Sequence, residues 1–97
     1  MKTSTPKFKL GNVRITDRAR AIAPNDKIQK LLERHQRGDW GDMSEQGKRL
    51  NNRALEDKSQ LLSVFGKGAG RIWIITDGDR ENTVVLTPED GRERRQK

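Results

Sequence analysis

Three short apolar runs in the last third of the chain restrict its fold more than any other feature. They cover residues 61–65, 71–76 and 83–87 and are rich in β-branched and aromatic side chains. Glycine-rich residues 66–70 separate the first two runs, and polar residues 77–82 separate the last two. This pattern predicts an antiparallel meander. The middle run is apolar at each of positions 72–75, so we expect a central strand with helices on at least one side.

The preceding region has helical periodicity. A helix is predicted over residues 27–37, capped by Asn25 or Asp26, because its apolar positions follow an i, i+3, i+4, i+7 spacing: Ile28, Leu31, Leu32 and His35. A second helix is predicted from a Ser44 cap to about Lys58, and residues 10–16 alternate like a half-buried strand. The sequence therefore predicts an α+β fold, with an antiparallel sheet of three to four strands packed against two helices.

The net charge of +7 is concentrated at the two ends of the chain. Residues 1–9 and 91–97 each carry a net charge of +3, whereas residues 10–90 hold 14 basic and 13 acidic side chains. We therefore expect one domain over residues 10–90 between two flexible basic tails, 1–9 and 91–97.

The absence of cysteine excludes disulfides and thiolate chemistry. No apolar run approaches the length of about 18 residues that a membrane span needs, and no signal peptide is visible. These features predict a cytoplasmic protein that does not bind membranes.

His35, the one histidine, is the candidate catalytic residue. It would act as a general base or acid, assisted by Asp39 or Asp42 just beyond the helix end. The alternative is a buried histidine that packs on Leu31, and we favour it because no nucleophile has a recognisable spacing to His35.

Trp40, in the segment Gly38-Asp39-Trp40-Gly41, is the candidate partner-binding residue. An exposed indole there would offer a stacking platform. Alternatively, the ring fills the gap between the two helices, and this is the favoured interpretation in a chain with four aromatic residues.

Six basic residues are candidates for nucleic-acid contact: Lys27, Lys30, Arg34, Arg37, Lys67 and Arg71. The first four form a stripe beside the apolar face of the first helix, and such a stripe can follow a phosphate backbone. The other two flank a glycine-rich segment that lacks a phosphate-loop ending and precedes a strand rather than a helix. A solvated helix face and a hairpin turn are the alternatives.

Asp77, Asp79 and Glu81 alternate as oxygen ligands of calcium do, but the glycine and the distal glutamate of a calcium loop are missing. A solvated turn is expected, and no metal or cofactor is predicted.

Several motifs together resemble a family of small uncharacterised bacterial proteins found on plasmids and other mobile elements. They are Arg34-His35, Gly38-Asp39-Trp40-Gly41, Asn51 or Asn52 with Ala54-Leu55, Leu62-Ser63, residues 71–76, Asp79-Arg80 and residues 85–90. Some members are labelled as a type I restriction methylase subunit, although 97 residues are too few for a methyltransferase domain. Gly91 stands where the family usually has an aromatic residue. The resemblance implies an accessory role beside a host-defence or plasmid-maintenance system.

Our functional hypothesis is a small non-enzymatic binding protein that acts through a protein partner, electrostatic nucleic-acid contact, or both. The alternative is a small metal-independent ribonuclease or toxin that uses His35 with Arg34, Arg71 or Arg80. A third possibility is a structural interaction protein that dimerises through an exposed edge strand over residues 83–87. For the chain in general we expect a monomer or a weak dimer.

Overall fold

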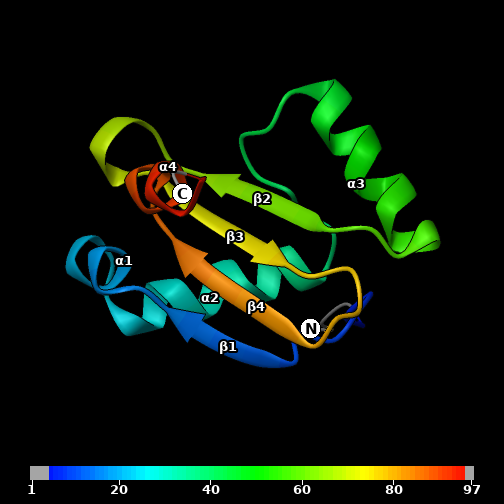
Figure 1. Cartoon of the computed structure of the whole chain (residues 1–97), viewed down its shortest axis with the longest axis horizontal. Coiled ribbons are helices and arrows are strands. Elements are labelled where there is room, and N and C mark those ends of the chain that lie inside the picture. Colours follow the sequence, from blue (N-terminus) through cyan, green and yellow to red (C-terminus); the bar gives the residue numbers. More distant parts are fainter. Residues whose placement is uncertain (1–4, 96–97) are drawn as a thin grey trace.

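The structure is a computed structural model that describes residues 5–95. Figure 1 shows an α+β fold, as the sequence predicted. The elements are, in chain order, β1 (Asn12–Ile15), α1 (Asp17–Ile22), α2 (Asn25–Gln36), α3 (Glu45–Asp57), β2 (Leu61–Phe65), the short 3-10 helix η1 (Gly68–Gly70), β3 (Ile72–Thr76), β4 (Asn82–Leu86) and α4 (Pro88–Arg95).

The helix starts differ in how their first amides are satisfied. Ser44 caps α3 as expected, because its side chain accepts a hydrogen bond from the backbone N–H of Gly47 at 3.0 Å. The cap predicted for α2 is wrong: Asn25 and Asp26 lie in its first turn, and the residue before it, Pro24, has no hydroxyl or carboxylate to accept a bond. The fixed backbone angle of a proline is compatible with the extended conformation found there.

The four strands form a mixed sheet in the order β1-β4-β3-β2. Strands β2, β3 and β4 are the predicted antiparallel meander, and β3 is central. The sheet differs from a purely antiparallel one because β1 pairs parallel to β4. The chain leaves β1 through helices rather than a hairpin, which allows a parallel neighbour. The edge role predicted for residues 83–87 is therefore wrong, since β4 lies between β1 and β3.

One face of the sheet is covered by α2 (Figure 1). Alternate residues of β2, β3 and β4 are buried, which is the period of two that a half-buried strand requires. The main core joins the apolar face of α2 to these strands; it includes Ile28, Leu31, Leu32, Phe65, Ile72, Ile74 and Val85. A smaller cluster of Trp40, Ala54 and Leu61 joins α3 to β2.

The segment predicted as a C-terminal tail is helical over its described part, residues 91–95. Gly91 permits α4 to approach the sheet, because a Cβ atom at this position would lie 2.4 Å from the ring of Trp73. At the other end, the N–H of Lys7 donates to the carbonyl of Gln36 at 2.7 Å, and Phe8 is half-buried against the smaller cluster. The flexibility predicted for residues 1–4 and 96–97 lies outside the described residues.

Candidate functional site

His35 is completely buried between α2 and the sheet. Its Nδ1 lies 2.6 Å from Ser63 Oγ, and its Nε2 lies 2.9 Å from Thr76 Oγ1. A hydroxyl 2.6 Å from an imidazole nitrogen has the geometry of a nucleophile and its base. Ser63 and Thr76 are also fully buried, however, so no substrate can reach this pair.

Hydrogen bonds run from His35 through the hydroxyls of Thr76 and Thr83 to the carbonyl of Leu10. Because a carbonyl can only accept, it determines the direction of each bond in this series. Thr83 Oγ1 donates its one proton to the carbonyl of Leu10 at 2.7 Å, so it must accept from Thr76 Oγ1 at 2.8 Å. Thr76 has then used its proton and accepts from the Nε2–H of His35. Since burial keeps the ring neutral, Nδ1 is unprotonated and accepts from Ser63, which fixes the tautomer of the ring.

Burial lowers the pKa of His35 to about 3, and the positive charge of Arg80 adds to the shift. The carboxylates expected to assist His35 have other partners: Asp39 binds Arg34, and Asp42 accepts from the backbone N–H of Gly66 at 2.8 Å. His35 is thus a buried histidine, as the favoured interpretation of the sequence had it. The general base that the ribonuclease hypothesis requires is inaccessible.

Trp40 is 3% exposed, so it offers no stacking platform, and its prediction as a partner-binding residue is wrong. Its indole N–H donates to Asn52 Oδ1 on α3 at 3.0 Å. Its ring stacks with Phe8 at a centroid distance of 6.4 Å and meets His35 edge-on at 5.8 Å. Trp40 therefore packs within the smaller core cluster. This is the structural alternative that the sequence analysis favoured over an exposed stacking platform.

Two of the six basic residues predicted to contact nucleic acid, Arg34 and Arg71, already have hydrogen-bond partners within the protein. Arg34 forms an ion pair with Asp39 at 2.7 Å, and its guanidinium lies 4.6 Å from the centroid of the Phe65 ring. The hydrogen bond to Asp39 raises the pKa of Arg34. Arg71 donates to the carbonyl of Gly66 at 3.3 Å.

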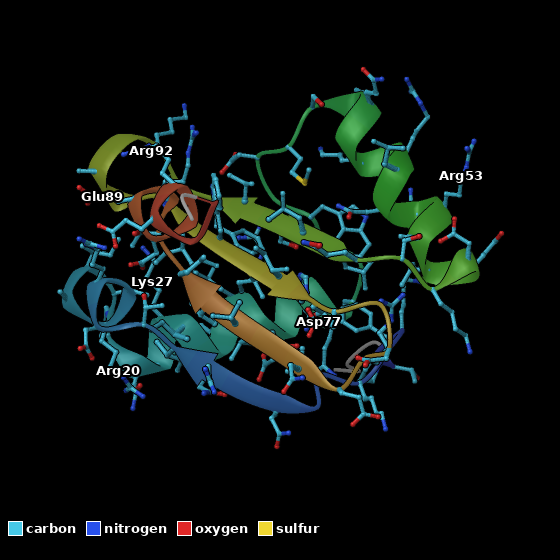
Figure 2. All side chains as sticks on the ribbon, in the orientation of Figure 1. Arg20, Lys27, Arg53, Asp77, Glu89 and Arg92 are labelled. Atoms are coloured by element: carbon cyan, nitrogen blue, oxygen red, sulfur yellow. The ribbon has the colours of Figure 1, made fainter. Side chains whose placement is uncertain are left out.

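Three of the six candidates, Lys27, Lys30 and Lys67, are exposed, whereas Arg37 is half-buried like Arg34 and Arg71. Figure 2 shows Lys27 close to the start of α2. The α2 stripe and the glycine-rich segment approach each other where Arg34 covers Phe65, one residue before Gly66. Nucleic-acid contact by these residues stays a prediction.

The acidic segment after β3 is a hydrogen-bonded turn. The backbone N–H of Asp77 donates to the carbonyl of Asn82 at 3.0 Å, and that of Glu81 donates to Asp79 Oδ1 at 2.9 Å. Within residues 5–95, no three or more histidine or acidic side chains gather as metal ligands would. The same range holds no helix that is long and apolar enough to cross a membrane.

The open face of the sheet is the feature that sequence reasoning missed. We use this name for Arg14, Leu62, Trp73, Ile75 and Val84, which point away from α2. Four of them, Arg14, Val84, Ile75 and Leu62, are cross-strand neighbours in one row over all four strands. The four apolar members are half-buried and Arg14 is exposed.

Two shallow hollows adjoin on the open face. The larger one, about 520 Å³, lies beside α4 and is lined by Gln60, Leu62, Trp73, Ile75, Asp77, Leu86 and Gly91. The smaller one, about 280 Å³, lies toward β1 and is lined by Asn12, Arg14, Ile75, Asp77, Asn82, Thr83 and Val84. Both include Ile75 and Asp77, and Figure 2 places Asp77 at the end of β3. They form one continuous surface. The larger hollow is lined mainly by apolar side chains, and the smaller one mainly by polar side chains.

A network of ion pairs holds α4 beside the open face. Arg18 on α1 binds both Asp90 and Glu93 at 2.9 Å, and Thr16 donates to Asp90 at 2.6 Å. Burial alone would raise the pKa of Asp90, but hydrogen bonds from Thr16, Thr87 and Arg18 outweigh it and lower the pKa to about 2. A wall of the larger hollow thus depends on contacts between residues more than 70 positions apart.

Comparisons with protein-family models, with curated proteins and with solved structures found no match.

Proposed function

We propose that this chain is a small binding module that recognises a protein partner through the open face. The observation that carries the proposal is the row of Leu62, Ile75 and Val84 on the side of the sheet that faces solvent. An antiparallel sheet with one solvated face usually has polar residues there. A contiguous apolar surface with a polar rim is instead typical of an interaction site.

The chemistry of the open face favours a protein over a nucleic acid. Bases would need an accessible aromatic ring. Trp40 is buried, and the ring of Trp73 is half-buried with one side against Gly91, so the open face presents only part of one aromatic ring. The charged groups around the hollows, Arg14 and Asp77, have opposite signs, which suits a polypeptide better than a polyanion.

An accessory role in a mobile element and a cytoplasmic location belong to this proposal. The first is supported by the resemblance of the sequence motifs, and the second by the absence of cysteine. Neither depends on the choice of partner.

Site-specific photo-crosslinking in the native host tests the proposal. A photoreactive residue would replace Ile75 on the open face or, as a control, Leu50 on α3, which is 60% exposed. We expect a discrete protein adduct from position 75 that is absent from position 50. Val84→Glu should abolish that adduct without unfolding the domain, because Val84 is only half-buried. The proposal would be contradicted if positions 75 and 50 gave the same set of crosslinked proteins, or if position 75 crosslinked to nucleic acid.

Electrostatic nucleic-acid contact is the second candidate, favoured by the exposure of Lys27, Lys30 and Lys67. Binding of the full chain to short labelled DNA and RNA would be measured over a salt series. If these residues bind phosphate, the affinity falls with salt, and a Lys27→Glu/Lys30→Glu variant has a shallower salt dependence. Unchanged binding in that variant would remove the stripe as a site.

A further inference from the structure

The two edges of the sheet differ in how their backbone groups are satisfied. On the β2 edge, the backbone N–H and C=O groups of Leu62 and Val64 point away from β3. All four of these groups have hydrogen-bond partners. Asn51 on α3 accepts from the N–H of Leu62 at 3.1 Å and donates to its carbonyl at 2.7 Å. The N–H of Val64 donates to Trp40 at 3.1 Å, and its carbonyl accepts from Asp42 at 2.6 Å. This edge is closed to another strand.

On the β1 edge, the corresponding groups belong to Val13 and Ile15. The N–H groups of Asn12 and Thr16 donate to the β4 side, to Glu81 at 2.8 Å and Val85 at 3.0 Å. Because successive residues of a strand alternate in direction, the N–H and C=O groups of Val13 and Ile15 point outward. Among residues 5–95, no hydrogen bond satisfies these four groups. Val13 is 40% exposed, so the edge is accessible.

Arg14 determines what kind of strand this edge can accept. Its side chain lies on the open face, opposite in direction to those of Val13 and Ile15, and within the described residues it has no salt-bridge partner. A second copy of β1, paired antiparallel to satisfy all four outward groups, would place its Arg14 directly opposite this one. Like charges at such a position are destabilising, whereas an acidic residue there is favourable.

We propose that the free edge of β1 binds an extended segment of a partner protein by strand addition. The segment alternates apolar, acidic and apolar residues, with the acidic side chain opposite Arg14 and the apolar ones beside Val13 and Ile15. Backbone hydrogen bonds supply the affinity, and the ion pair supplies the selectivity. The proposal goes beyond the proposed function, because it uses a different surface and does not depend on binding at the open face.

Two blocked seven-residue peptides, one centred on Val-Glu-Val and one on Val-Lys-Val, test the edge. Each would be titrated into the full-length protein and followed by amide NMR shifts and hydrogen exchange, up to about 5 mM. We expect the glutamate peptide to shift and protect the amides of Val13 and Ile15. The lysine peptide should bind roughly tenfold more weakly, because the cross-strand charge pair changes sign.

Charge reversal provides the decisive control. Arg14→Glu should invert the preference between the two peptides, whereas Arg53→Glu, which makes the same change on the far side of α3 (Figure 2), should leave it unaltered. Equal binding of both peptides, no binding, or shifts confined to other residues would overturn the proposal. So would a wild-type dimer that already protects Val13 and Ile15. A discrete crosslink from position 75 would survive each of these results, so the two proposals fail separately.

Discussion

The buried state of His35 makes a quantitative prediction about acid stability. The pKa of the ring is about 3 in the folded protein and about 6.5 in an unfolded chain. Between these values the unfolded state binds one proton more than the folded state. Stability is therefore full above about pH 6.5 and is lost as the pH falls toward 3.

The expected loss between pH 7 and pH 5 is about 2 kcal/mol, at a slope approaching 1.4 kcal/mol per pH unit. This loss is a substantial fraction of the 5–15 kcal/mol that typically stabilises a domain, and it raises the ratio of unfolded to folded protein roughly 30-fold. Urea unfolding at several pH values would measure it. Most carboxylates remain ionised above pH 5, so His35 dominates the change in this range.

His35→Gln is the matched variant, because an amide retains a donor and an acceptor but does not titrate. We expect it to be less stable at pH 7 by roughly 1–3 kcal/mol, with a much smaller dependence on pH between 7 and 5. As His35 is the only histidine, one imidazole resonance in the wild-type protein reports its titration even if the variant does not fold. Titration near pH 6.5, or an unchanged slope in the variant, would refute the buried network.

Three further substitutions test local packing. Gly91→Ala should destabilise the protein by roughly 1–3 kcal/mol in thermal unfolding, because the new methyl group meets Trp73; a change below about 0.5 kcal/mol would contradict the close approach. Asp90→Asn should cost on the order of 1–2 kcal/mol at pH 7, and the difference should shrink as the pH falls from about 4 to about 2, since the carboxylate of the unfolded wild type protonates first and that of the folded protein only near pH 2; a constant difference would exclude an ionic role. Asn51→Ala should cost roughly 1–3 kcal/mol by leaving the backbone of Leu62 unpaired, and sedimentation should detect self-association through the opened edge; wild-type stability with no association would show that the edge needs no cover.

The elements with a strong period were predictable, and those fixed by distant contacts were not. The meander and α2 follow from alternation and from the spacing of Ile28 and Leu31. The segment of α4 has no apolar period, and its helix is held by contacts of Asp90 with Thr16 and Arg18, more than 70 residues away in sequence. No local pattern encodes such a contact.

The partners of His35 could have been predicted from the alternation of the strands. Ser63 and Thr76 occupy strand positions with the same parity as buried neighbours such as Phe65 and Ile74, so alternation places their hydroxyls inside. A polar residue on the buried face needs a partner, and the apolar face of α2 offers one histidine to supply it. The open face was not predicted, because a strand such as β3, with apolar residues on both of its sides, usually indicates a sheet that is buried on both faces.

The open face and the free edge meet at Arg14, and this junction decides whether they serve one partner or two. Arg14 neighbours Val84 on the open face, while the backbone on either side of it forms the edge. If one partner covers both surfaces, Arg14→Glu should weaken the crosslink from position 75 as well as the glutamate peptide. If two partners bind, the same variant should lose the peptide and retain the crosslink. Ile75→Glu lies two strands from the edge, about 10 Å, and should not affect the peptide in either case. A loss of peptide binding in Ile75→Glu would mean that the substitution disturbs the sheet itself, and the separation of the two surfaces would have to be abandoned.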